Sequence, residues 1–360
     1  MKIFAGLIAS ISILMAGCGG GGVDGGNVKN LNTVGIFSIT GSILSARIGN
    51  TATLLGNGKV LVAGGLGAVE TLRAVELYDL ATGAFVTTGN MSSARQAHSA
   101  TLLENGKVLL AGGTTDVFTS SLATAELYDP IAGNFTPTGG MVFSRANHTA
   151  TLLSNGQVLI AGGSSLGASA TAEIYDSATG TFNATGSLLA ARNNATATLL
   201  TSGKVLFVGG SADARAELYD PMLGVFTVTG SLAEARYYHS ATRLTNGKVL
   251  IAGGTIQAAE LYDPNSGVFA HEGSLLQQRN NATSTLLTDG RILFAGGNSG
   301  ATTLASAELY DPTSHLFYSA GSMSAARAGH KATRLSNGKT LISGGGAIPS
   351  GIVSTSELYQ

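Results

Sequence analysis

The stretch His98-Ser-Ala-Thr-Leu-Leu-Glu-Asn-Gly-Lys-Val-Leu-Leu-Ala-Gly-Gly113 holds two short segments joined by Asn105-Gly106. The first segment alternates in polarity and the second is a continuous apolar run, and both patterns are typical of β-strands. Asn-Gly is a strong hairpin signal, because the tightest hairpin turn needs a positive φ at both central residues. The stretch therefore predicts two antiparallel strands that end at a pair of glycines.

The residues that follow extend this hairpin to four strands. Residues 123–140 read ATAELYDPIAGNFTPTGG, in which a Tyr-containing segment and a Phe-led segment flank the turn at 129–133. No part of the unit keeps a helical period over ten residues. One unit of about 45 residues therefore predicts a four-stranded antiparallel sheet.

The same unit recurs seven times from about residue 35 onward. Its glycine pairs lie at 64–65, 112–113, 162–163, 209–210, 253–254, 296–297 and 344–345. Four-stranded units of this length that close into a ring are the blades of a β-propeller. We therefore predict an all-β, seven-bladed β-propeller over residues 35–360.

The two ends of the repeat region complement each other. The last copy stops at residues 357–360 without a Phe-led strand, whereas residues 35–42 supply such a strand at the start. We expect the N-terminal strand to complete the last blade, because that pairing removes an open sheet edge.

The first 17 residues are predicted to be an export signal peptide. Lys2 precedes an apolar run that ends at Met15 and is too short to cross a bilayer. Residues 14–18, Leu-Met-Ala-Gly-Cys, resemble the lipobox of bacterial lipoproteins. The resemblance implies that Cys18, the only Cys of the chain, becomes lipidated after cleavage. Gly19 in place of Asp implies sorting to the outer membrane.

Residues 18–34 then serve as the lipidated Cys and a Gly-rich, flexible tether. We expect a protein of the bacterial cell envelope that contacts the membrane through its lipid anchor only. Whether it faces the periplasm or the exterior stays open.

Composition narrows the classes of function. The chain has 51 glycines in 360 residues, about twice the usual frequency. Charged residues make up 11 % and the net charge is −1, so the basic field of a nucleic-acid-binding protein is missing. We expect no nucleic-acid partner, no cofactor and no metal, and a monomer.

The glycine pairs, the downstream Tyr and an aromatic residue on the last strand resemble kelch repeats. The resemblance covers roughly residues 35–360 and implies a kelch-type propeller. Phe takes the place of the usual Trp in every copy, at Phe37, Phe85, Phe135, Phe182, Phe226, Phe269 and Phe317. Copper-radical oxidases have a kelch-like propeller, but they use a Cys joined to a Tyr, and here the only Cys is assigned to the lipid.

Every copy carries one Arg and one Glu at fixed positions. They are Arg47, Arg95, Arg145, Arg192, Arg236, Arg279 and Arg327, and Glu76, Glu126, Glu173, Glu217, Glu260, Glu308 and Glu357. We predict buried Arg–Glu pairs, since buried charges need partners. The alternative is a ring of Arg at the channel mouth that binds anions.

Four copies carry a His three residues after this Arg, namely His98, His148, His239 and His330. They suggest either a metal site or a structural residue at the start of the inner strand. The structural role is favoured, because ligands must converge on one point.

The segments after Arg differ most in polarity in three neighbouring copies. They carry the pairs Asn193-Asn194, Tyr237-Tyr238 and Asn280-Asn281. Amides and phenols suit hydrogen bonding and stacking with a sugar or peptide. We predict a shallow ligand site at these six residues, with ordinary turn residues as the alternative.

These features favour a non-catalytic binding or scaffold module for a protein or glycan, which it would contact through variable top-face loops. The alternative is a periplasmic or surface enzyme that processes sugars, such as a mutarotase-like isomerase with an acid/base site. Glu234, near Arg236 and the Tyr pair, is the best carboxylate for that role.

Overall fold

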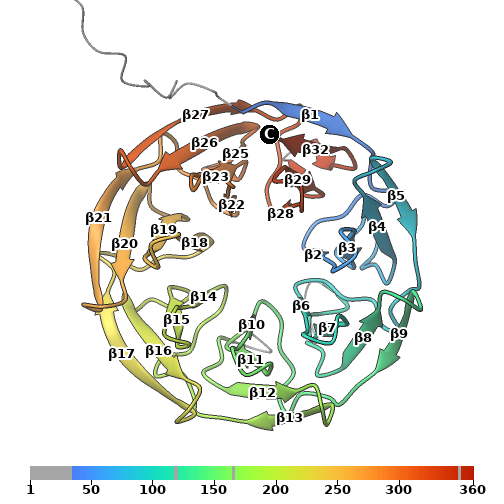
Figure 1. Cartoon of the computed structure of the whole chain (residues 1–360), viewed down its shortest axis with the longest axis horizontal. Helices are drawn as coiled ribbons and strands as arrows, with labels where there is room; N and C mark the ends of the chain where they lie inside the picture. Colours follow the sequence, from blue (N-terminus) through green and yellow to red (C-terminus); the bar gives the residue numbers. More distant parts are fainter. Residues whose placement is uncertain (1–34, 117–120, 164–166, 348–349) are drawn as a thin grey trace, which may run out of the picture. The chain divides into compact units, whose positions relative to one another are not determined.

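The computed structural model describes residues 35–116, 121–163, 167–347 and 350–360. In these residues, seven four-stranded antiparallel sheets surround a central axis and form a seven-bladed β-propeller (Figure 1). The predicted all-β class, blade number and strand number are confirmed. Cys18 and the predicted signal peptide and tether lie outside the described residues. Among the described residues, no helix is long and apolar enough to cross a membrane.

In the first six blades the chain runs outward from the axis, strand by strand (Figure 1). Blade one contains β2 (Thr51–Leu54), β3 (Val60–Ala63), β4 (Val75–Asp79) and β5 (Ala84–Thr87). Blade two contains β6 (Ser99–Leu102), β7 (Val108–Ala111), β8 (Ala125–Asp129) and β9 (Asn134–Pro137). Blade three contains β10 (Thr149–Leu152), β11 (Val158–Ala161), β12 (Ala172–Asp176) and β13 (Thr181–Ala184).

Blade four contains β14 (Thr196–Leu199), β15 (Val205–Val208), β16 (Arg215–Asp220) and β17 (Val225–Ser231). Blade five contains β18 (His239–Arg243), β19 (Val249–Gly253), β20 (Ala258–Asp263) and β21 (Val268–Ser274). Blade six contains β22 (Thr283–Leu286), β23 (Ile292–Ala295), β26 (Ser306–Asp311) and β27 (Leu316–Ser322). A small hairpin of β24 (Asn298–Ser299) and β25 (Thr302–Thr303) extends from blade six.

Blade seven is built from both ends of the described chain. It contains β28 (Lys331–Arg334), β29 (Thr340–Ser343), β32 (Ser356–Tyr359) and, outermost, β1 (Phe37–Thr40). A second small hairpin, β30 (Gly346–Ala347) with β31 (Gly351–Ile352), extends from it. β1 pairs antiparallel with β32, with Phe37 opposite Tyr359. The predicted closure of the last blade by the N-terminal strand is confirmed.

The hydrophobic core lies between neighbouring blades. The second strand of each blade is buried along its whole length, because both of its faces pack against another sheet. In each blade the Tyr of the third strand packs against the Phe of the fourth, with ring centroids 4.7–5.0 Å apart. Phe therefore occupies the outer-strand position that Trp usually occupies in kelch repeats.

The repeated Arg and Glu form a buried ion pair in every blade. In the described residues, seven such pairs have N···O distances of 2.5–3.0 Å, and each Arg is at most 1 % exposed. The predicted pairing is confirmed. The alternative of an anion-binding ring of Arg is wrong, because these guanidinium groups are buried and already neutralised.

Each ion pair also makes further hydrogen bonds to the main chain, although the buried Nε of Arg95, Arg145, Arg236 and Arg327 has no hydrogen-bond partner among the described residues. Arg145 donates from Nη1 to the carbonyl of Gly162 at 2.8 Å, and Glu173 accepts the N–H of Val142 at 2.6 Å. The other blades repeat both contacts. These additional hydrogen bonds help to make a buried ion pair tolerable, since desolvating the charges is costly.

The Arg main chain joins each blade to the preceding one. The second Gly of each pair donates its N–H to the Arg carbonyl of the next blade at 2.8–2.9 Å, and Gly345 closes the circle onto Arg47. The first Gly lies just as close: Gly112 adopts φ +64°, and a Cβ there would lie 2.5 Å from the carbonyl oxygen of Arg145 in the next blade. The glycine pair is therefore needed for the close approach of two blades.

We expect Arg145→Met to lower the free energy of unfolding by about 3–5 kcal/mol, because Glu173 would keep a buried, unpaired charge. Guanidinium denaturation measures this change. The exposed pair Lys107–Asp129, at 3.2 Å, supplies the control, because its charges stay hydrated. Lys107→Ala should leave the midpoint nearly unchanged, and equal losses in both variants would contradict a special role of the buried pair.

Candidate functional site

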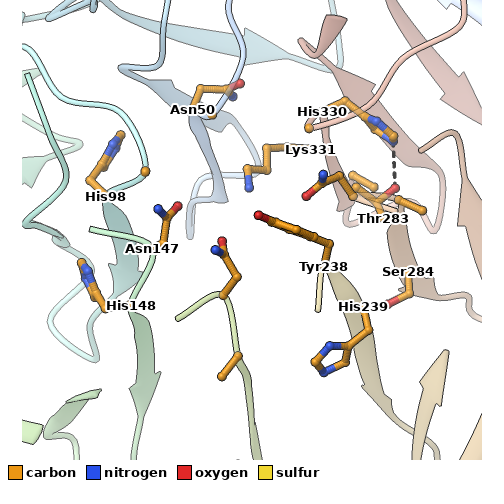
Figure 2. Close-up of a pocket in the computed structure, with 18 residues that line it drawn as sticks. Asn50, His98, Asn147, His148, Tyr238, His239, Thr283, Ser284, His330 and Lys331 are labelled. Atoms are coloured by element: carbon orange, nitrogen blue, oxygen red, sulfur yellow. Dashed lines mark hydrogen bonds between the residues drawn. The ribbon is translucent and has the colours of Figure 1, made fainter. Parts of the chain in front are cut away.

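A cavity of about 410 Å³ opens at the axis of the propeller. All seven blades contribute the segment that links the buried Arg to the innermost strand, and blades five, six and seven also contribute the first residues of that strand (Figure 2). The lining residues stand two to five positions after the Arg. The repeated ion pair of each blade thereby fixes the position of the main chain from which these side chains extend.

The second residue after each Arg lies in the left-handed region of backbone conformation. These residues are Gly49, Ala97, Asn147, Asn194, Tyr238, Asn281 and Gly329, with φ between +52° and +68°. Five of them donate their N–H to the carbonyl of the equivalent residue in the preceding blade, at 2.9–3.2 Å. The backbone of this segment thus forms a hydrogen-bonded rim around the axis.

Glycine and Asn favour this conformation, but a bulky residue pays about 1–2 kcal/mol for it. Tyr238 nevertheless adopts φ +57°, and its side chain is 45 % exposed. Figure 2 shows its phenol directed into the cavity, across from Asn147. Strain of this kind, held at a cavity, is a reason to look for function there.

The structure separates the six predicted ligand residues into two groups. Asn194, Tyr238 and Asn281 line the cavity. Asn193 and Asn280 are not among the lining residues, and their N–H groups bond to the loop behind them, to Gly210 and Asn298, at 2.8 Å.

Tyr237 is also absent from the cavity lining and is half-buried. Asn147, which is not one of the six, belongs to the lining set.

Glu234 lies in a different place from Tyr238. It is exposed and lines a separate pocket of about 250 Å³ with Glu260 and His271. Among the described residues that line the central cavity, none is Asp or Glu. The structure therefore does not bring the predicted carboxylate and the phenol of Tyr238 to one site.

The four repeated His residues connect neighbouring blades. Each Nε2 lies 2.8–3.1 Å from a hydroxyl oxygen at the start of the preceding blade, on Thr51, Ser99, Thr196 or Thr283. Burial and nearby Arg residues lower the pKa of His148, His239 and His330 to about 3, and shift the pKa of His98 the same way. These imidazoles are therefore neutral at physiological pH, and their role is structural.

Lys331 is a site residue that the sequence reasoning missed. The fourth residue after the Arg is Ser or Thr in the other six copies, at Thr51, Ser99, Thr149, Thr196, Ser240 and Thr283. Lys331 replaces it in blade seven and lines the cavity (Figure 2). Alignment of the seven copies at this position would have revealed it.

The ammonium group of Lys331 has no hydrogen-bond or ion-pair partner among the described residues. The side chain is half-buried. Desolvation lowers its pKa from the usual value, because a buried ammonium group loses hydration. Lys331 therefore brings an uncompensated positive charge to an otherwise neutral cavity.

The comparisons with known proteins support the fold. No protein-family model matches the chain, and no curated protein matches it. A solved structure described as a novel fungal alcohol oxidase of the AA5 family, in complex with copper, superposes with a TM-score of 0.77 at 18 % identity. The match covers 91 % of this chain and 76 % of that one. At this identity the likeness shows a shared propeller fold alone.

The described residues do not fit a copper site. Copper in proteins is held by converging imidazole, thiolate or phenolate groups. Here the Nε2 of each repeated His is hydrogen-bonded to a hydroxyl group. Within the described ranges, no group of three or more His, Cys, Asp or Glu could hold a metal ion. Cys18 lies outside those ranges.

We expect the propeller to lose stability as the pH falls below 6.5. Unfolded His has a pKa near 6.5, whereas in the folded chain the pKa is about 3 for His148, His239 and His330 and is well below the usual value for His98, so the unfolded chain binds up to four more protons in between. Stability therefore rises with pH across this window, by about 1.4 kcal/mol per pH unit for each proton.

Denaturation at several pH values measures this slope. His148→Ala copies the residue of two other blades, Ala195 and Ala282, and should reduce the slope between pH 4.5 and 6 by up to one proton. An unchanged slope would contradict a buried, neutral His148.

Proposed function

We propose that this protein is a non-catalytic binding module of the bacterial envelope. In this proposal it is a kelch-type propeller, lipid-anchored through Cys18 at the outer membrane, and it takes the end of a glycan into the central cavity. The proposal rests on one observation: several polar side chains line the cavity and make no hydrogen bond to other described residues.

The side chains of Asn147, Tyr238 and Asn281 line the cavity and make no hydrogen bond to other described residues. The repeated Arg, Glu and His, by contrast, are all engaged within the ring. Amide groups can donate to and accept from sugar hydroxyls, and a Tyr ring can stack on a sugar face. A volume of about 410 Å³ lies at the lower end of ligand pockets. It suits one or two sugar rings.

The alternative is a sugar-processing enzyme of the mutarotase type. Such an enzyme needs an acid and a base within hydrogen-bond reach of one substrate. Glu234 lines another pocket, so the carboxylate expected for that role does not support it. A protein ligand, bound through the variable top-face loops, is the other possible outcome of the binding test.

Tyr238→Asn tests the proposed site. Asn occupies the equivalent position in three other blades and tolerates a positive φ, so the variant should fold with equal or slightly higher stability. Loss of the phenol should weaken binding of a glycan hit by about tenfold, since aromatic contacts contribute about 0.5–1.5 kcal/mol beyond area burial.

The measurement is a glycan array probed with the full chain in detergent, followed by calorimetry on the strongest hit. Tyr237→Phe is the matched control, because Tyr237 does not line the cavity. It should bind as the unaltered protein does. Equal affinity of the Tyr238→Asn variant, or no glycan hit at all, would overturn the proposal.

A further inference from the structure

The charge of the central cavity comes from one residue. The seven buried Arg are each neutralised by a Glu, and the four His are neutral. Among the described lining residues, Lys331 is the only remaining group with a formal charge. A ligand in this cavity therefore meets a single positive charge and no negative one.

Lys331 also departs from the repeat without a compensating change. Six copies have a small hydroxyl residue here, and four of these residues, Thr51, Ser99, Thr196 and Thr283, bond a His of the next blade. Replacing such a residue by Lys brings a partly desolvated ammonium group to the axis, which is unfavourable unless a counter-charge arrives.

We infer that the cavity selects an acidic sugar, with the carboxylate bound by Lys331 and the hydroxyls by the amides of the rim. This inference rests on the proposed function, because it names the class of sugar that the same cavity takes. The inference adds Lys331 to the binding site and predicts a preference for negatively charged sugars, which a site for neutral glycans would not show.

The position of the ammonium group supports a carboxylate. Figure 2 shows Lys331 and Tyr238 directed into the same space, with Asn147 across from them. A carboxylate on the ammonium group would form a charge-assisted hydrogen bond, which is roughly twice as strong as a neutral one. The sugar ring would then lie within reach of the phenol and the amides.

The described lining of the cavity has no carboxylate, which further restricts the class of ligand that fits. An amino acid or other zwitterion would leave its ammonium group without a partner, which disfavours it in a partly desolvated site. One ammonium group also matches one negative charge better than the two of a phosphate monoester. A hexuronic acid, with one carboxylate and several hydroxyls, fits these conditions.

Calorimetry with the full chain in detergent tests the inference, with glucuronic acid, glucose and acetate as probes. The unaltered protein should bind glucuronic acid at least tenfold more tightly than glucose, and acetate only weakly, because a carboxylate alone makes none of the rim contacts. Lys331→Thr restores the repeat residue and should fold. It should reduce the ratio of the glucuronic acid and glucose affinities by about tenfold to a hundredfold.

Lys331→Arg should keep most of that ratio, because it keeps the charge. Lys339→Thr removes one positive charge from an exposed hairpin and should leave the ratio unchanged, which separates a local contact from net charge.

The outcomes distinguish the two proposals. Binding of glucose and glucuronic acid with equal affinity, or an unchanged ratio in Lys331→Thr, would overturn the acidic-sugar inference and leave the glycan site standing. Acetate as tight as glucuronic acid would also overturn it, in favour of a plain anion site. If neither sugar nor any glycan of the array binds, the proposed function itself is wrong.

Discussion

The buried Arg–Glu pair is the interaction on which the rest of the structure depends. Within a blade, the guanidinium group ties the entry segment to the glycine turn and to the third strand. Between blades, the carbonyl of the same Arg accepts the N–H of the preceding glycine pair. Because an incomplete buried ion pair is costly, neither its residues nor its glycines vary among the seven copies. The segment after the Arg is consequently held at the axis.

This constraint decides which positions are free to bind a ligand. The repeated Arg and Glu neutralise each other in ion pairs, and the repeated His residues form hydrogen bonds between blades. What remains is the rim residue at positive φ, where five copies have the Gly or Asn that the backbone prefers. Tyr238 departs from that preference and is directed at the cavity. A ring held together by seven buried ion pairs can accept a strained residue such as Tyr238 without losing its fold.

The fold could be predicted from the sequence because each blade repeats the same hairpin signals, and even the closure by residues 35–42 follows from the missing last strand. The site could be predicted only in part. Asn194 and Asn193 are adjacent and chemically identical, yet only the one at positive φ lines the cavity. That sign of φ is set by contacts between blades, which composition does not reveal. Lys331 was within reach of sequence comparison among the copies.

A residue that departs from the repeat is interpreted differently depending on whether a second replacement supplies it with a partner. In blade five, Glu272 replaces the Thr that bonds a Tyr hydroxyl of the next blade, and His315 replaces a turn Gly. The two replacements meet, since Glu272 bonds both His315 and Tyr310. Lys331 has no such counterpart among the described residues. A charge that the fold itself leaves unbalanced, at the mouth of a cavity, is balanced most simply by a ligand of opposite charge.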